Sequence, residues 1–546
     1  MNNRVVKIPE PSGRFRYVPV LIGAMLGLFF AVYYLGWNKL SGHFDTQNVA
    51  DDRFAQIIGA SYYVRDGWHL PLGSTPNLHQ PEGTNVVFTD SIPVAAIIHK
   101  LLTSGTTHFF NYFDLWIGLN FVVQGVLLAI IFQRLGISSL VALSASVAIG
   151  LNLPCLINRF GHASLCTHFL IVASIALYVN RKYTTRVTRD ALLYGIILVI
   201  ALYVHIYLLA MLLPLFAAWI VQNTMEGKYT TTRAIVTVAT TSSVLMVLLY
   251  ALIGINTNTM PSTGGGYGQY GMDIASPVLP WISGVFNTDG SKVMYGLATQ
   301  YEGFNYLGLG VILLTLNAFI FGYGSVKIII RQNIWYALAA IILTAFAVTH
   351  RWFFASIKIG TIPYIAPGYF FEQFRGSGRF FWPVAYIIMI SGLVIYTKVW
   401  RAKWAVLVLV FLALIQIYDA SWVSKHSAFP STLNFPAVLN ERAEWRAVVS
   451  SYNAVNIYPY FWCGGNNYHM LQELFYICSL ENKPINNGYI ARNQRSCDSQ
   501  YDELLPLEDR TLYVFIKAVY TLDEVMTLTK GTGVISERAG AYIVFR

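Results

Sequence analysis

Long apolar runs, separated by polar and turn-rich segments, fill the first 420 residues of the chain. An α-helix needs roughly 20 apolar residues to cross a bilayer. The run at 17–37 has no small-residue cleavage site after it and is too long for a secretory signal, so we expect a retained anchor. The runs together predict about eleven membrane-spanning helices, at 17–37, 113–133, 137–153, 163–180, 190–206, 207–223, 234–254, 304–324, 333–350, 380–397 and 404–420.

Basic residues fall in every second connection between these runs, at 4–16, 134, 181–189, 228–233, 327–331 and 398–403. The positive-inside rule predicts that these connections and the N-terminus are cytoplasmic. The opposite side then receives the remaining connections and the tail, at 38–112, 154–162, 255–303, 351–379 and 421–546. We therefore expect the functional site on the extracytoplasmic side.

The tail from residue 421 onward carries more charge and shorter apolar runs. Its patterns predict helices at 435–449 and 522–529, and strands at 511–517 and 541–546. The tail is long enough to form a core of its own. The predicted fold is thus an α-helical polytopic membrane domain over 1–420, followed by a C-terminal extracytoplasmic α/β domain over 421–546.

Composition supports the membrane assignment. Hydrophobic residues make up 55% of the 546-residue chain and charged residues only 12%, against about 25% charged residues in a soluble domain. The net charge of +10 would indicate nucleic acid in a soluble protein. Here much of the basic excess lies in short connections that set topology, so we expect no nucleic-acid partner. Neither a P-loop nor a dinucleotide fingerprint occurs.

The five cysteines include three in the tail, where an extracytoplasmic location permits a disulfide. We favour a bridge between Cys463 and Cys497, because Cys478 lies in an apolar helix-like run and fits a core thiol. The C-x-x-C spacing of a metal or redox site is absent.

Carboxylates first gather in the loop 38–112, at Asp45, Asp51 and Asp52. Asp51 and Asp52 open a helix-like segment over 54–64, and adjacent residues cannot share one helix face. One carboxylate fits a helix cap, and the other fits a general base that takes a proton from an attacking hydroxyl. Asp45 is a weaker candidate for either role or for a metal ligand. The loop ends in an apolar segment, 94–102, which is too short to span the membrane. We expect a helix along the membrane surface there, with residues 89–93 as its N-terminal cap.

Three further segments carry candidate binding residues. Arg159 and His162 lie in a short turn between two spans, where ionisable residues are costly and usually functional, although a snorkelling arginine and a satisfied histidine are the alternative. Arg375 and Arg379 flank small residues just before a helix, as in a phosphate clamp. General contact with lipid phosphates is the alternative there. Glu302 lies at the extracytoplasmic end of another predicted span and is a candidate partner for Arg375 and Arg379.

The glycine-rich segment 264–271 follows a span on the same side. A flexible connector is the favoured interpretation. The sharper hypothesis is a mobile cover over a site, with Tyr267 and Tyr270 available to stack on a sugar.

Taken together, the segments 88–93, 159–162, 306–310 and 374–383 resemble a bacterial family of multi-spanning membrane proteins. That family is similar to the GT-C superfamily of polyprenyl-phosphate-dependent glycosyltransferases, which includes phage-type O-antigen glucosylating enzymes. The resemblance runs in order from about residue 17 to the tail. It implies a catalytic carboxylate in the first outside loop, where Asp52 fits best and Asp51 next.

The resemblance also implies a function. A polyprenyl phosphate donor would supply a hexose such as glucose to an O-antigen, lipopolysaccharide or other surface glycan at the periplasmic face of a bacterial inner membrane, with inversion. Interfacial arginines would neutralise the departing lipid phosphate. No cofactor is assigned, and a divalent metal is left open. One rival hypothesis is a flippase or transporter for a lipid-linked glycan, a class of protein that often has internal repeats and broken helices. Another is a glycan polymerase or ligase.

Overall fold

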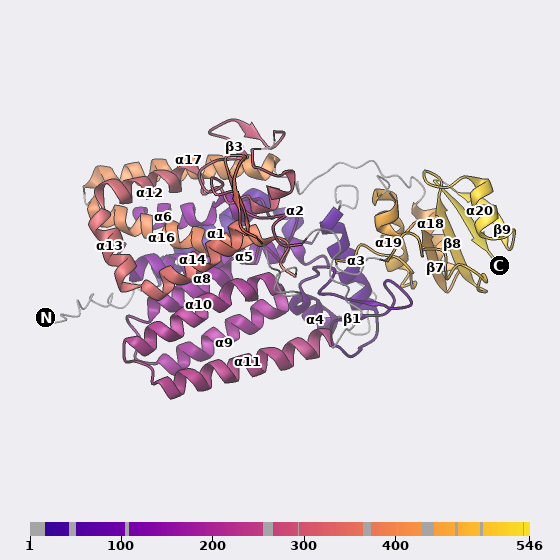
Figure 1. Ribbon diagram of the computed structural model, residues 1–546, viewed down its shortest axis with the longest axis horizontal. Helices are drawn as coiled ribbons and strands as arrows, with labels where there is room; N and C mark the ends of the chain where they lie inside the picture. The colour runs from indigo at the N-terminus through magenta and orange to yellow at the C-terminus, as the bar shows by residue number, and fades with distance from the viewer. Residues whose placement is uncertain are drawn as a thin grey trace.

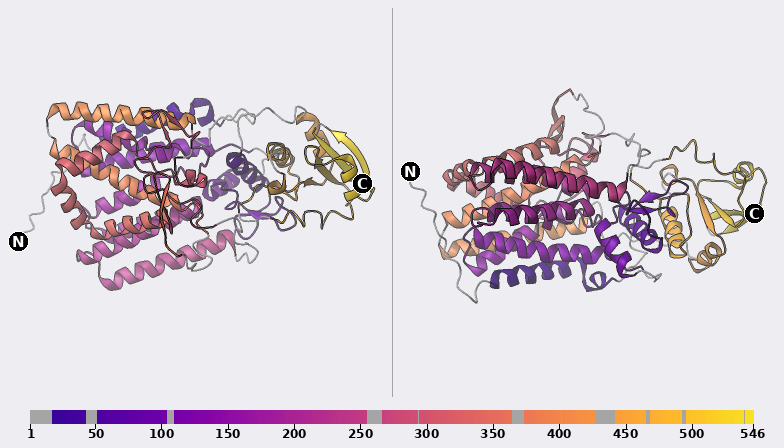
Figure 2. Two further views of the ribbon diagram at one scale, coloured as in Figure 1. Left: turned by 45° about the horizontal axis from the view of Figure 1, so that its top comes forward. Right: turned by 90° about the horizontal axis from the view of Figure 1, so that it is seen from below.

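The computed structural model describes residues 17–42, 51–103, 109–254, 266–292, 294–363, 373–400, 402–426, 442–464, 468–491, 495–538 and 540–546. A bundle of helices forms the larger part, and a smaller domain with a sheet lies beyond one end of it (Figure 1). The helix α3 lies between the two parts, as the turned views also show (Figure 2).

Within the described ranges, seven helices are long and apolar enough to cross a membrane. The number is eight if α12 (Leu309–Phe321) and α13 (Tyr323–Gln332), bent by 97°, count as one span. The chain is therefore a mostly helical polytopic membrane protein. The seven helices are α1 (Val18–Leu35), α5 (Phe113–Arg134), α9 (Val187–Val204), α10 (Ile206–Met225), α11 (Thr231–Ile253), α16 (Trp382–Val399) and α17 (Lys403–His426).

The other three predicted spans are shorter apolar helices: α6 (Leu140–Leu151), α8 (Phe169–Asn180) and α14 (Ile334–Val348). A 12-residue helix such as α6 or α8 is about 18 Å long, well short of a hydrocarbon core of about 30 Å. Between them the chain passes through α7 (Pro154–Ile157) and a series of turns. Every residue from 145 to 168 is buried, so the short helices make room for a non-helical segment inside the bundle.

In the part of the chain that the structure describes, four connections with basic residues meet at one end of the bundle, those near residues 134, 181, 228 and 331. The Tyr183 hydroxyl donates to the carbonyl of Arg134 (2.8 Å), and the Lys228 amine donates to the carbonyl of Arg181 (2.7 Å). Arg181 also donates to the side chain of Asn333 (2.8 Å). The first loop and the C-terminal domain lie at the opposite end (Figure 1).

The first loop folds into α2 (Trp37–Leu40), α3 (Asp51–Arg65), a small hairpin of β1 (Ser74–Thr75) and β2 (Thr84–Asn85), and α4 (Pro93–Leu102). The predicted side-chain cap of α4 is wrong: the helix begins at Pro93 after Ile92, which has a φ of 53°, and no side chain caps it. The Ser91 hydroxyl instead donates to the carbonyl of Gln56 in α3 (2.9 Å). This contact holds α3 against the start of α4.

The C-terminal domain contains a four-stranded sheet in the order β7-β8-β10-β9, in which only the β7–β8 pair is parallel. Helices α18 and α19 pack on one face of the sheet, and α20 packs on the other. The predicted helix at 435–449 is described only from residue 442 onward. The elements are α18 (Arg442–Ser450), β7 (Ala454–Tyr458), α19 (Tyr468–Leu480), β8 (Thr511–Ile516), α20 (Leu522–Leu528), β9 (Val534–Arg538) and β10 (Ala541–Phe545).

The helix α3 belongs to the core of the C-terminal domain as much as to the bundle. Its residues Phe54, Ile58 and Tyr62 are buried in the cluster that contains Leu471 and Leu474 of α19. Residues 53–64 of α3 are all buried, because α3 is covered on both sides. The first loop is thus the joint between the two parts of the molecule.

The remaining short elements in the described ranges are two hairpins and three 3₁₀ turns. They are the hairpins β3 (Ile282–Ser283) with β4 (Thr288–Asp289) and β5 (Arg351–Phe354) with β6 (Ile357–Thr361), and the 3₁₀ turns η3 (Ala298–Gly303), η4 (Ser377–Phe381) and η5 (Phe461–Cys463). Cys463 and Cys497 form a disulfide, the pair that the sequence favoured, and Cys478 is a buried free thiol.

Candidate active site

Asp52 pairs with His162 at the end of the bundle nearest the C-terminal domain. Asp52 lies in the first turn of α3, and His162 lies in the buried segment between α7 and α8. The Nε2 atom of His162 is 2.9 Å from Oδ2 of Asp52, and the other carboxylate oxygen accepts a hydrogen bond from the hydroxyl of Tyr489 in the C-terminal domain. The next residue, Arg53, pairs with Asp114 at the start of α5. Three parts of the chain therefore fix this carboxylate.

These contacts keep the pair charged. Burial alone would raise the pKa of Asp52, but the charge of His162 and the hydrogen bonds from His162 and Tyr489 lower it below its usual value. Burial would lower the pKa of His162, but the Asp52 carboxylate raises it. The carboxylate therefore stays ionised, which is the state that a general base needs before it accepts a proton.

We expect His162→Asn to move the acid limb of the pH–rate profile to higher pH. Without the imidazolium, burial dominates and the pKa of Asp52 rises, so the base is lost to protonation at a less acidic pH. A measurement of kcat/KM against pH on the purified protein tests this. His69→Asn, at a more exposed histidine with a carboxylate neighbour of its own, is the matched control and should leave the limb in place. A lower rate with an unmoved limb would mean that His162 serves packing only.

Glu302 joins two arginines from different parts of the chain. Its carboxylate lies 2.7 Å from Arg159 and 2.9 Å from Arg379, and its backbone carbonyl accepts from Arg159 at 2.9 Å. Burial alone would raise the pKa of Glu302, but the two guanidinium groups lower it to about 2. One negative charge faces two positive charges here, so the cluster keeps an excess of one positive charge. Such an excess favours an anionic ligand.

We expect Glu302→Gln to destabilise the protein strongly. The change is nearly isosteric, but it leaves Arg159 and Arg379 as two buried cations without their shared carboxylate. Removing one partner of a buried ion pair costs about 3–5 kcal/mol, which a thermal or chemical unfolding series in detergent would detect. Glu537→Gln, at an exposed carboxylate of the C-terminal domain, is the control and should change little. Equal unfolding midpoints for the two variants would contradict the buried-cluster account.

Arg375 lies just before η4, and Arg379 lies within it, ahead of α16. Arg379 packs over the ring of Tyr207, with its Cζ atom 5.0 Å from the ring centroid, and Arg375 lies 5.9 Å from the ring of Tyr270. Among the described residues Arg375 has no carboxylate partner within 4 Å. A Cβ at Gly378 would come within 2.5 Å of the Gly303 backbone, so the glycine permits the close approach of η4 and η3.

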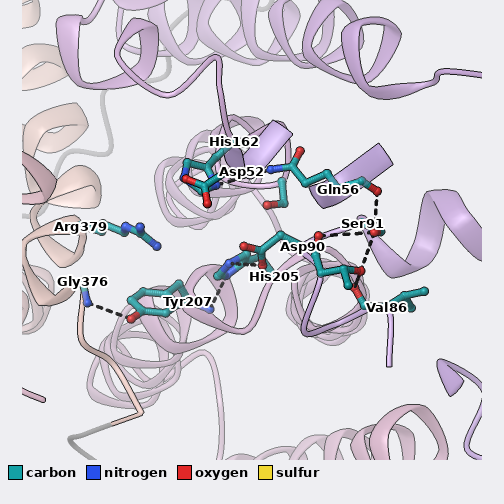
Figure 3. A network of polar contacts seen from close by, with 12 residues as sticks. Asp52, Gln56, Val86, Asp90, Ser91, His162, His205, Tyr207, Gly376 and Arg379 are labelled. Atoms are coloured by element: carbon teal, nitrogen blue, oxygen red, sulfur yellow. Dashed lines mark hydrogen bonds and ion pairs between the residues drawn. The ribbon is translucent and has the colours of Figure 1, made fainter. Parts of the chain in front are cut away.

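A second carboxylate–histidine pair, which the sequence did not single out, faces the first. Oδ1 of Asp90 is 3.2 Å from Nε2 of His205, and Nδ1 of His205 accepts the backbone N–H of Tyr207 at 3.1 Å. Burial would raise the pKa of Asp90, but His205 lowers it. The sequence feature that could have identified this pair is His205 itself, a histidine at the junction of two apolar runs. Figure 3 shows Arg379 extending toward the space between the two pairs.

The remaining predicted site residues are placed as follows. Tyr270 contacts Arg375. The Tyr267 hydroxyl instead donates to the carbonyl of Phe346 (3.1 Å), so this side chain packs against α14. Asp45 and the glycines at 264 and 265 lie outside the described residues, as does the side chain of Asp51. Across the ranges that the structure describes, no three His, Cys, Asp or Glu side chains form a metal-binding group.

These features define a class: a helical polytopic membrane protein whose buried ionisable groups gather where its spans meet an appended α/β domain. A family model described as a domain of unknown function (DUF6311) matches residues 24–421, and the model of the DUF6311 C-terminal domain matches residues 444–545. The chain belongs to this family. A search of curated proteins found no match.

Proposed function

We propose that the protein is a membrane glycosyltransferase. It moves a sugar, a hexose such as glucose, from a polyprenyl phosphate carrier to a hydroxyl of a surface glycan such as an O-antigen or lipopolysaccharide, with inversion at the anomeric carbon. Asp52 is the general base, and Arg375 and Arg379 bind the donor phosphate. The resemblance to GT-C enzymes points to the same activity.

The observation that carries the proposal is the closeness of the acid and the cations. The charges of Arg379 and Asp90 both act on His162, which itself contacts Asp52. An acceptor hydroxyl on Asp52 and a phosphate on Arg379 would therefore lie near each other, since Arg379 extends toward the space between the two carboxylate–histidine pairs (Figure 3). A site at the end of the spans fits a donor whose lipid tail stays in the membrane while its sugar lies outside.

The side chains divide the reaction between them. The proton of the acceptor hydroxyl passes to a carboxylate oxygen of Asp52 while the acceptor oxygen bonds to the anomeric carbon. The bond from that carbon to the phosphate oxygen breaks, and its electron pair leaves with the polyprenyl phosphate. Arg375 and Arg379 stabilise the negative charge that develops there. Attack from the face opposite the phosphate inverts the anomeric configuration.

The charge distribution supports an orientation for this chemistry. The basic connections gather at the end of the bundle away from Asp52, and the positive-inside rule makes that end cytoplasmic. The site and the C-terminal domain then face the periplasm of a bacterial cell, above the inner membrane. A disulfide in the C-terminal domain agrees with an oxidising compartment.

A carrier for the same lipid-linked substrate is the main rival. Broken helices near the middle of the membrane mark many carriers, and α12 and α13 form one bent pair. However, α13 lies at the end of the bundle away from the site (Figure 1). The position of the bend therefore gives the carrier hypothesis no support at the site.

The proposal is tested by supplying the purified protein with polyprenyl phosphate donors that differ in their sugar, together with a lipopolysaccharide acceptor. We expect one donor to be consumed and its sugar to appear in the acceptor. Movement of the donor across a vesicle membrane with no bond cleavage would instead support the carrier. Product chains with many added units would indicate a polymerase.

A further inference from the structure

An aromatic residue of the C-terminal domain reaches the proposed base. The Tyr489 hydroxyl donates to Oδ1 of Asp52, although the two residues are 437 positions apart in the chain. The Tyr489 ring stacks on the buried ring of Phe461, with centroids 4.6 Å apart and an angle of 14° between the planes. The phenol is therefore held in place from within its own domain.

The neighbour of this tyrosine is a large exposed aromatic side chain. Trp462 meets the Tyr489 ring edge to face, with centroids 5.1 Å apart, and 41% of its surface is exposed. It belongs to the 3₁₀ turn η5, whose last residue, Cys463, is anchored by the disulfide to Cys497. An indole fixed in this way costs little conformational entropy when a ligand binds.

The two aromatic residues keep a fixed position relative to Asp52. The segment that carries Tyr489 hydrogen-bonds through its backbone to the first loop at three places. The bonds are Ile485 N–H to the Asn77 carbonyl (2.9 Å), Gln80 N–H to the Ile485 carbonyl (2.8 Å), and Ala491 N–H to the Phe88 carbonyl (2.8 Å). Arg495 further pairs with Glu82 of the same loop. The C-terminal domain is thus attached to the loop that supplies the base.

We propose that Trp462 and Tyr489 form the platform on which the acceptor glycan binds. The apolar face of a pyranose ring packs against the indole of Trp462, because aromatic faces combine a large apolar area with little lost entropy. The hydroxyl to be glycosylated then reaches Asp52 alongside the Tyr489 phenol, since a carboxylate has lone pairs for both. This inference rests on the proposed function only for the role of Asp52 as base.

The platform predicts acceptor binding that does not require a donor. The probe is the oligosaccharide released from lipopolysaccharide by mild acid, titrated without donor onto the full chain in nanodiscs. We expect Trp462→Ala to weaken its binding about tenfold or more, and Trp462→Tyr to keep most of the affinity. Met526→Ala is the matched control, because Met526 is equally exposed (41%) but lies on α20 on the other face of the sheet. Binding of polyprenyl phosphate should be the same in all three variants.

The outcomes separate this inference from the proposed function. Equal oligosaccharide binding by the wild type and Trp462→Ala, or no binding by the wild type, would overturn the platform. A wild type that binds the oligosaccharide through Trp462 but transfers no sugar from any polyprenyl phosphate donor would instead overturn the transferase and leave a glycan-binding domain.

Discussion

We expect Asp52→Asn to lower the rate of sugar transfer by about 10³-fold, the middle of the range for losing a general base. The amide keeps the shape of the carboxylate and still accepts the hydrogen bond from Tyr489, so the first turn of α3 keeps its contacts. It cannot take the proton of the acceptor hydroxyl. It also leaves His162 without the carboxylate that raises its pKa, so the loss combines base removal with a changed local charge.

The matched control for this variant is Asp51→Asn, at the adjacent carboxylate that the sequence alone could not separate from Asp52. We expect this control to keep most of the activity, because Asp52 is the residue that pairs with His162. The rates of both variants are measured at saturating donor, after gel filtration has shown equal recovery of folded protein. A fully active Asp52→Asn enzyme, or a larger loss in the control, would contradict the assignment of the base.

Arg375→Ala raises the KM for the polyprenyl phosphate donor by about 10- to 100-fold. A hydrogen bond to a charged group contributes roughly 1.5–3 kcal/mol, and tenfold in affinity corresponds to about 1.4 kcal/mol. Among the residues that the structure describes, Arg375 is paired with no carboxylate. Its loss therefore removes a ligand contact without leaving a buried charge unpaired, and the unfolding midpoint should hardly move.

The control for this variant is Arg351→Ala, which removes a half-buried arginine from β5 rather than from the turn before η4. Donor KM and donor binding in the absence of acceptor are measured for both variants. An Arg375→Ala protein that binds the donor as tightly as the wild type would remove Arg375 from the phosphate site. Equal weakening in the control would point to a general effect of surface charge.

Apolar periodicity predicted the long helices well, because a span of about 20 residues leaves a clear signal. It overestimated α6 and α8, since the apolar run around 153–166 continues into a buried segment that is not helical. A side chain buried by protein and one that faces lipid look alike in sequence. The strands β7 and β9 were missed because both lie at the edges of the sheet and mix polar residues with apolar ones.

The site was partly visible in the sequence because ionisable residues at span mouths are costly. That argument singled out Arg159 and His162, and Glu302 was a candidate partner of Arg375 and Arg379, of which it contacts Arg379. Asp52 came from the carboxylates of the first loop and from the resemblance, and nothing in the sequence paired it with His162. The pair of Asp90 and His205 and the approach of Tyr489 depend on how distant segments pack. No local pattern encodes a hydrogen bond between residues 437 positions apart.

The measurement that bears most directly on the central claim is transfer of labelled hexose from polyprenyl phosphate to a lipopolysaccharide acceptor, by the wild type and Asp52→Asn side by side in nanodiscs. We expect the wild type to release polyprenyl phosphate and form a glycosidic bond of inverted configuration, and the variant to do both about 10³-fold more slowly. Retention of configuration, equal turnover by the two proteins, or no consumption of any polyprenyl phosphate sugar by the wild type would contradict the account.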